Sequence, residues 1–212
     1  MRSNIIRRLR DSYLGQAWLV LFLSICFGGS LAAVQTRLGP VIEQNKINET
    51  FEKVPELLLG RELAQQLAAR NQAPEIVPQQ VTVDANGKQV VWTIYRARYQ
   101  DKDWGCVVKS SGRGYADAIE LLVGVDPKIN KIRGLYILDQ KETPGLGNRI
   151  LEEAWRDQFI GKSAADPIIV VKNGAQGDRE VNAISGATIS SKSVAQIVNQ
   201  TTLQLRQALS GQ

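Results

Sequence analysis

Histidine is absent from the 212-residue sequence, and cysteine occurs only twice, as Cys26 and Cys106. Zinc, haem and iron–sulfur sites are built mainly from these two residue types, so we do not expect this chain alone to form one. Cys26 lies inside an apolar run and Cys106 lies far outside it, which argues against an intramolecular disulfide. Any redox chemistry is therefore expected to come from an organic cofactor.

Proline is also scarce, and outside the N-terminus no charge of one sign dominates. With 7 prolines, 43% hydrophobic and 22% charged residues, the composition is that of a globular protein. Residues 1–16 contain four arginines and one aspartate, so this segment carries +3 of the net charge of +5 and the rest carries only +2. A nearly neutral domain gives no electrostatic reason to expect a nucleic-acid partner.

Residues 17–34 form an apolar run of 18 residues without a charge. A helix of that length spans about 27 Å at about 1.5 Å per residue, close to the roughly 30 Å hydrocarbon core of a bilayer. Four arginines precede the run, and Trp18 lies near its start, as the positive-inside rule and interfacial aromatic residues predict. We expect a transmembrane helix at residues 17–36, with residues 1–16 as a basic cytoplasmic N-terminus.

Two other interpretations of the apolar run remain open. A cleaved signal peptide is one, since small residues follow Ser30. The run is longer, however, than the roughly 7–15 apolar residues of a typical signal peptide. A buried core helix is the other, but the run is apolar on every face, which favours a lipid environment.

The rest of the chain alternates strand and helix signals. The Asn86-Gly87 step between two β-rich runs is a strong hairpin signal. The final segment has apolar residues three and four positions apart, which predicts a helix packed on a sheet through one face. That face contains Val194, Ile197, Val198, Thr201, Leu205 and Leu209.

The predicted elements suggest an α+β fold, a mostly antiparallel sheet flanked by helices. A helix is expected at residues 56–70, a loop at 71–78, and strands at 90–98, 105–109, 118–125 and 132–138. A short helix is expected at residues 150–158, a short buried strand at 168–171 and a polar loop at 173–180.

The segment SGAT, Ser185 to Thr188, comes directly before the final helix. Serine and threonine are common helix caps, so the segment could serve only to begin the helix. A helix N-terminus also presents free N–H groups and the positive end of a dipole, which suits a phosphate. A threonine hydroxyl at this place could carry a phosphate ester. Both interpretations remain open from the residues alone.

A second segment reads ETPGLG, from Glu142 to Gly147. Pro144-Gly145 is a common turn dipeptide, so an ordinary connection is the simpler interpretation. The two glycines would also let backbone amides approach the edge of a planar ligand, with Leu146 against its face.

Together, ETPGLG and SGAT about forty residues later resemble the FMN-binding domain shared by two respiratory membrane complexes. These are the Rnf-type ion-translocating electron-transport complex and the sodium-translocating NADH:quinone reductase. The compact length is more similar to the G subunit of the former than to the C subunit of the latter. The resemblance also extends to Gly114-Tyr115, residues 121–126, Trp155, Phe159, Gly161-Lys162 and Val171-Lys172.

The resemblance implies that FMN is joined covalently, through its phosphate, to Thr188. A dedicated flavin transferase would make that phosphoester, using FAD as donor together with Mg²⁺. Lys172 is a candidate for neutralising charge near the cofactor, with a solvated lysine at a strand end as the alternative. The resemblance places the remaining site residues in two groups: Ser185, Gly186 and Ala187 at the phosphate end, and Glu142, Thr143, Leu146 and Gly147 along the flavin.

Two residues differ from the family's pattern. Asn182 stands where the transferase motif begins with aspartate, and Gln140 stands where a histidine is common. Asparagine keeps the size and the acceptor oxygen of aspartate but loses its charge.

The expected protein is thus a flavoprotein subunit of the bacterial inner membrane that relays electrons and is not catalytic alone. Its expected divisions are the N-terminus and anchor described above, a helical linker and helix at residues 37–80, and an extracytoplasmic FMN-binding domain at residues 81–212. Its partners would be the other subunits of the complex, the flavin transferase and the membrane. The alternatives are a C-type subunit of the quinone reductase, and a membrane-anchored binding module without flavin.

Overall fold

The computed structural model describes residues 13–85 and 88–210, and these divide into two compact units, Met1–Asn48 and Glu49–Gln212. In the first unit the described residues form one helix, which is the beginning of α2 (Tyr13–Leu59). Its apolar side chains, including Trp18 and Phe27, are exposed. By length and composition, α2 is a helix long and apolar enough to cross a membrane.

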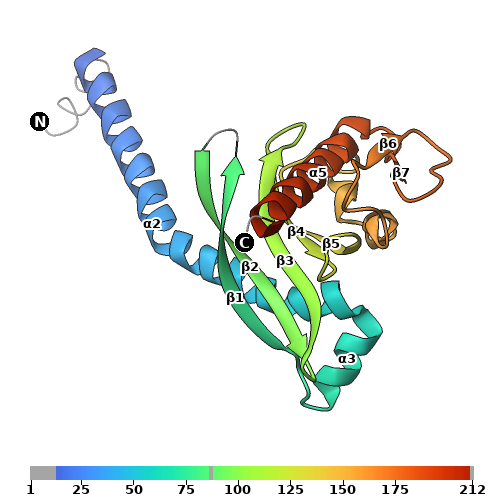
Figure 1. The fold of residues 1–212 in the computed structure, drawn as a ribbon. Helices are drawn as coiled ribbons and strands as arrows, with labels where there is room; N and C mark the ends of the chain where they lie inside the picture. Colours follow the sequence, from blue (N-terminus) through green and yellow to red (C-terminus); the bar gives the residue numbers. More distant parts are fainter. Residues whose placement is uncertain (1–12, 86–87, 211–212) are drawn as a thin grey trace, which may run out of the picture. The chain divides into compact units, whose positions relative to one another are not determined.

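The second unit is built on a five-stranded antiparallel sheet whose strands follow one another in space as they do in sequence (Figure 1). This arrangement confirms the predicted α+β fold. A pair of short parallel strands, β6 and β7, forms a second sheet. The strands are β1 (Glu75–Ala85), β2 (Lys88–Tyr99), β3 (Lys102–Arg113), β4 (Ala118–Val125), β5 (Ile132–Asp139), β6 (Ile169–Val171) and β7 (Glu180–Asn182).

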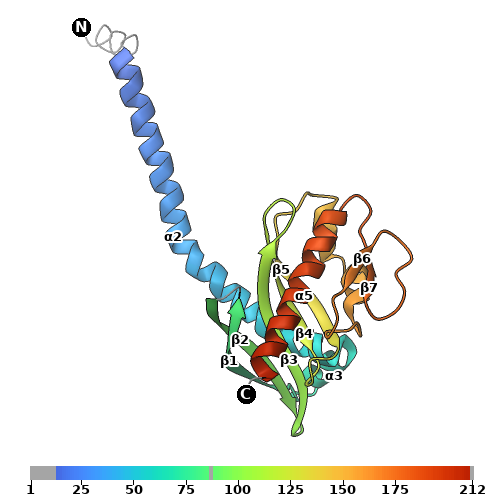
Figure 2. The same cartoon turned by 45° about the horizontal axis from the view of Figure 1, so that its top comes forward.

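Both faces of the large sheet are apolar, because successive side chains of a strand point to opposite faces. On one face Val108 and Leu121 belong to the core that α5 (Thr188–Ser210) covers, and α5 lies across that face in Figures 1 and 2. Val107 and Leu122, their immediate neighbours in sequence, are buried on the other face.

The last turns of α2 cover this second face. Val54, Leu57 and Leu58 are buried there with Leu122. The Tyr136 hydroxyl of β5 also donates a hydrogen bond of 2.6 Å to the Glu49 carboxylate. Burial, and then the neighbouring carboxylate, raises the pKa of Tyr136 to about 12, so this side chain donates as a neutral phenol across the physiological range.

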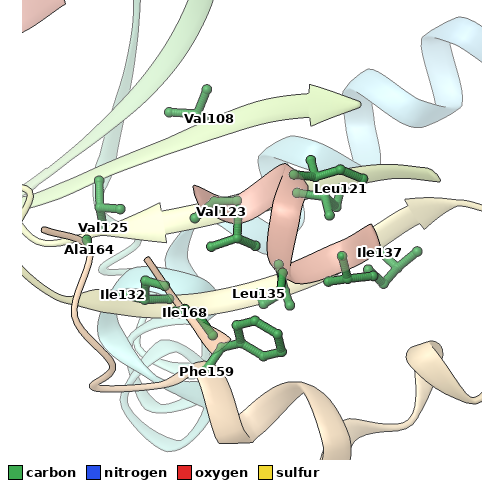
Figure 3. Close-up of a cluster of buried hydrophobic side chains, with 14 of the residues drawn as sticks. Val108, Leu121, Val123, Val125, Ile132, Leu135, Ile137, Phe159, Ala164 and Ile168 are labelled. Carbon is green, nitrogen blue, oxygen red and sulfur yellow. The ribbon is translucent and has the colours of Figure 1, made fainter. Parts of the chain in front are cut away.

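Three short helical pieces cover the side of β5 that faces α5. They are η1 (Gly147–Leu151), α4 (Glu153–Arg156) and η2 (Asp157–Phe159). Figure 3 shows the ring of Phe159 beside Leu135, within the same buried cluster. Trp155 packs edge-on against Phe159 with ring centroids 5.3 Å apart.

The predicted helix at residues 56–70 is wrong in two respects: residues 56–59 are the end of α2, which continues from Tyr13, and the helix breaks at Gly60. This residue has φ +85°, a left-handed conformation suited to glycine, and it separates α2 from α3 (Arg61–Ala69). The predicted loop at residues 71–78 is too long, since β1 begins at Glu75. Pro78 is tolerated there because β1 is an edge strand.

Other expected elements were correct in place but not in extent. Strands β1 and β2 pair as the hairpin signal predicts, although Asn86 and Gly87 themselves lie outside the described residues. The expected short helix is the series η1, α4 and η2. The strand expected to be buried at 168–171 is β6, where Ile169 is 51% exposed, and its partner β7 was not predicted.

The final helix was predicted correctly, and so was its buried face. Of the six residues expected on that face, Val194, Ile197, Val198, Thr201 and Leu205 are buried, and Leu209 packs partly buried against the core.

Replacing Gly134 by alanine should destabilise the domain. Gly134 and Gly124 are register partners beneath Leu57 of α2. A Cβ on Gly134 would lie 2.9 Å from the Leu57 carbonyl oxygen, which is backbone and cannot yield by changing rotamer. We expect Gly134→Ala to lower the free energy of unfolding by about 1–3 kcal/mol, measured by thermal unfolding of the detergent-solubilised chain.

The matched control is Gly124→Ala, whose Cβ would lie 3.2 Å from the same oxygen and should cost less. A Gly134→Ala chain as stable as the wild type would contradict close packing of α2 on β5.

Candidate functional site

The ETPGLG loop connects β5 to η1 and folds back on itself. The Thr143 carbonyl accepts the N–H groups of Leu146 and Asn148, each at 3.2 Å. Gly145 has φ +76°, the left-handed conformation that this tight turn requires. The loop exposes Thr143 and Leu146 and buries Gly147.

Glu142 begins this loop, and its carboxylate is only 4% exposed. Oε1 accepts the backbone N–H groups of Tyr115, at 2.8 Å, and Ala116, at 3.2 Å. Oε2 accepts the hydroxyl of Ser190, at 2.6 Å. The carboxylate therefore joins the β3–β4 connection, the ETPGLG loop and the first turn of α5.

The SGAT segment leads into α5 in close contact with the loop. Gly186 has φ +79°, and a Cβ there would lie 3.0 Å from the Leu146 side chain. Ser185 and Gly186 are exposed, Thr188 is half-buried and Ala187 is buried. The structure thus brings the two motifs of the sequence together at the start of α5.

The first turn of α5 has open backbone donors. The Ala187 carbonyl accepts the Ser191 N–H at 3.0 Å, which begins the helical ladder. Within residues 13–85 and 88–210, no acceptor contacts the N–H groups of Thr188, Ile189 and Ser190, and neither the Ser185 nor the Thr188 hydroxyl caps them. The simpler interpretation of SGAT, a side-chain helix cap, is therefore not realised.

Exposed apolar side chains belong to the three segments that meet at this place. Tyr115, Leu146 and Ile189 are 61%, 46% and 57% exposed, and each adjoins a residue of the Glu142 network or of SGAT. Nearby, the Asn148 side-chain oxygen is buried without a donor among the described residues. Open amides beside exposed apolar side chains suit a ligand that is anionic at one end and flat and apolar at the other.

Lys172 and Asn182, both singled out from the sequence, lie after β6 and at the end of β7. Lys172 is exposed just after β6, and its side chain makes no described contact with the ETPGLG loop or with SGAT. Asn182, at the end of β7, accepts the Ala175 N–H through Oδ1 at 2.9 Å, and its carbonyl accepts the Trp155 indole N–H at 2.8 Å. Asn182 thus holds the 173–180 loop against the core.

Two titratable groups of the second unit have shifted pKa values: Asp117, in the β3–β4 connection, and Cys106, within β3. The Ala118 N–H, and then the Lys141 ammonium, hold the pKa of Asp117 below its ordinary value. Burial raises the pKa of the Cys106 thiol to about 12, so at neutral pH this cysteine is protonated and unreactive.

Sequence reasoning missed Ser190 and the backbone amides of Tyr115 and Ala116. The ETPGLG glutamate stands 48 residues before Ser190, and no periodicity links the two. The available signal was only that a serine follows Thr188 two positions later, where a helix would turn it toward the opposite side.

Residues 114–202 match the family model described as FMN-binding domain. The G subunit of the Na⁺-translocating ferredoxin:NAD⁺ oxidoreductase complex of Acetobacterium woodii is 42% identical over 98 residues, which are 46% of each chain. The G subunit of the proton-translocating complex of Clostridium ljungdahlii is 38% identical over 120 residues, 57% of this chain and 62% of that protein.

A C subunit of Na⁺-translocating NADH-quinone reductase, from Vibrio alginolyticus, is 32% identical over 126 residues, 56% of this chain and 49% of that protein. The chain therefore matches between 46% and 62% of the length of these three relatives.

Solved structures share the fold. The crystal structure of the C subunit from Parabacteroides distasonis superposes with a TM-score of 0.58 at 22% identity, covering 77% of this chain and 93% of that one. The NqrC structure from Shewanella oneidensis gives 0.53 at 24% identity, covering 60% and 70%.

Proposed function

On the premise that residues 114–202 are an FMN-binding domain related to those of the G and C subunits above, we propose that this chain is the G subunit of an Rnf-type electron-transport complex. Its role would be to relay electrons between ferredoxin and NAD⁺ through FMN bound by a phosphoester to Thr188. The complex of Acetobacterium woodii is named as Na⁺-translocating and that of Clostridium ljungdahlii as proton-translocating. We therefore propose ion translocation for this chain's complex and do not specify the ion.

The observation that carries this proposal is the uncapped first turn of α5. Three N–H groups, of Thr188, Ile189 and Ser190, have no acceptor among the described residues, and they lie in the same turn as the Thr188 hydroxyl. Backbone donors at a helix start favour a phosphate, and their dipole adds to the attraction. Such donors are satisfied by a capping side chain, by water or by a ligand, and the described residues supply no capping side chain here.

The residues present fit FMN. The open amides suit its phosphate, and Leu146, with Tyr115 and Ile189, offers apolar surface for its ring. The buried Asn148 oxygen would gain a donor from a ligand bearing N–H or O–H groups. When bound, FMN supplies the redox chemistry, and the chain supplies its position.

The covalent step is proposed with its atoms balanced. The Thr188 hydroxyl oxygen forms a bond to the flavin-side phosphorus of FAD while the phosphoanhydride bond breaks. AMP leaves, and the hydroxyl proton passes to solvent through the flavin transferase. Thr188 is half-buried, so part of the residue is accessible to a second protein. Lys172, exposed beyond β6, is proposed to add positive charge near the cofactor.

The C-type subunit of a quinone reductase is the second candidate, supported by the 32% identity to the Vibrio alginolyticus subunit. Subunits that copurify with the full-length chain from its own membranes distinguish the two, because the two complexes have different partner subunits.

Replacing Thr188 by valine should abolish covalent flavin while the domain stays folded. Valine keeps the shape of threonine and removes the hydroxyl that would bear the ester. We expect flavin fluorescence on a denaturing gel to disappear for Thr188→Val. In the wild-type chain, intact mass should show one added FMN less water. Thr82→Val, at an exposed position on β1, is the control and should keep the fluorescence. Fluorescence that persists in Thr188→Val would exclude Thr188 as the attachment residue.

Replacing Asn182 by aspartate should increase the attached fraction. The resemblance places an aspartate here in the transferase motif, and an aspartate oxygen can still accept the Ala175 N–H that Asn182 accepts. We expect Asn182→Asp to keep the thermal midpoint and to raise the ratio of flavinylated to unmodified chain by intact mass. Asn182→Ala, which loses the acceptor, should instead cost about 1 kcal/mol of stability. A lower attached fraction in Asn182→Asp would contradict the interpretation.

The chain is proposed to be anchored in the bacterial inner membrane by residues 17–36, with residues 1–16 in the cytoplasm and the FMN domain outside. The arginines of the first sixteen residues favour this orientation. A phosphatase that is active only outside the cytoplasm, fused after the C-terminus, should be active, and the same enzyme fused after Gln16 should not. Activity in the reverse pattern would overturn the topology.

A further inference from the structure

The buried Glu142 carboxylate accepts three hydrogen bonds. Its three donors are the Tyr115 and Ala116 amides and the Ser190 hydroxyl, at 2.8, 3.2 and 2.6 Å. In the part of the chain that the structure describes, no lysine or arginine lies within ion-pair distance of it. A buried carboxylate that lacks hydrogen-bond donors strongly destabilises the folded state. The fold therefore favours the arrangement in which all three bonds are made.

Two glycines close tightly around this carboxylate. A Cβ on Gly147 would lie 2.9 Å from Glu142 Oε2 and 2.9 Å from the Ser190 hydroxyl oxygen. A Cβ on Gly114 would collide with Glu142 Oε1. The Glu142–Ser190 contact therefore has little room to shift.

Helix geometry connects this contact to Thr188. Successive helical residues are turned by about 100°, so side chains two positions apart point to nearly opposite sides. Ser190 is 2% exposed and points toward Glu142, whereas Thr188 is half-buried. Holding Ser190 on the buried side therefore sets the rotation of the first turn and leaves Thr188 on the accessible side.

We propose that Glu142 is a positioning residue for FMN: through its hydrogen bond to Ser190 it fixes the first turn of α5, and so the direction of the Thr188 hydroxyl and of the open amides. Glu142 acts as a hydrogen-bond acceptor in a fixed place, and its charge is not required. The inference rests on the proposed function and adds two residues to it, Glu142 in a new role and Ser190.

The test compares four variants of the full-length chain, each coexpressed with the flavin transferase. Glutamine at position 142 keeps an acceptor for the two amides and offers its NH₂ group to Ser190, so Glu142→Gln should keep most of the attached flavin. Glu142→Ala and Ser190→Ala should each lower attached flavin per folded chain by about tenfold, the factor expected from losing a buried hydrogen bond. Attachment is read by in-gel fluorescence and intact mass, and folding by thermal unfolding.

The fourth variant is a matched control on the same helix. Thr201 is 1% exposed, and its hydroxyl contacts the Ser110 hydroxyl at 2.7 Å. Thr201→Val also deletes a buried hydrogen bond from α5, so it should lower the thermal midpoint about as much as Ser190→Ala while keeping the attached flavin. Visible circular dichroism reports the setting of the flavin, and it should change in the residual flavin of Ser190→Ala and not in Thr201→Val.

Several outcomes would overturn the inference while leaving the proposed function intact. Ser190→Ala could keep both the wild-type amount of flavin and its dichroism. Glu142→Gln could lose as much flavin as Glu142→Ala while folded, which would assign the effect to charge. Thr201→Val could lose as much flavin as Ser190→Ala, which would assign it to general destabilisation. A wild-type chain without attached flavin would overturn the covalent proposal and this inference together.

Discussion

Neighbouring residues of β3 and β4 are buried on opposite faces of the sheet. Val107 and Leu122 lie on one face, and Val108 and Leu121 lie on the other. A sheet that is apolar on both faces must be covered on both, and a helix supplies each cover: α5 on one side, the last turns of α2 on the other. This requirement places α5 on one face of the sheet. The start of α5, where the two motifs meet, is placed with it.

The axis of α5 is therefore positioned by contacts over several turns. Val194, Val198 and Leu205 pack into the core over several turns, and Gly112 of β3 lets Ile197 approach closely. These contacts fix the axis of the helix but leave its first turn free to fray, since the N–H groups there have no helical partner. The Glu142–Ser190 hydrogen bond holds the buried side of this first turn in place.

The fold could be predicted well from the sequence wherever periodicity was strong. The apolar stripe of α5 predicted both the helix and its buried face, and the hairpin signal at Asn86-Gly87 predicted the pairing of β1 and β2. The helix break and the short strand were harder to predict. Gly60 has a left-handed backbone conformation, but it lies within a run of leucines whose spacing predicts a continuous helix. Strand β7 is too short to show an alternating pattern. Its parallel pairing with β6 depends on residues eleven positions apart in the chain.

The site, like the fold, could be predicted only in part from the sequence. The two motifs that the sequence singled out do meet, because a loop after β5 and a helix over the sheet converge at one end of the domain. The sequence did not predict which atoms of the two motifs are in contact. Glu142 was expected beside the ligand, and the structure shows its carboxylate occupied by Ser190 and two amides. Lys172, chosen for its charge, has no described contact with either motif.

The donors that Glu142 binds explain why the N–H groups at the start of α5 remain available to a ligand. A carboxylate near a helix N-terminus commonly accepts the N–H groups of the first turn. Glu142 instead takes two amides from the β3–β4 connection and a hydroxyl from Ser190, so it stabilises the turn without consuming the turn's own amides. A carboxylate is thus buried on one side of α5, while the N–H groups of Thr188, Ile189 and Ser190 have no acceptor in the part of the chain that the structure describes. Had Glu142 capped the helix directly, a phosphate at Thr188 would have to compete with it for the same donors.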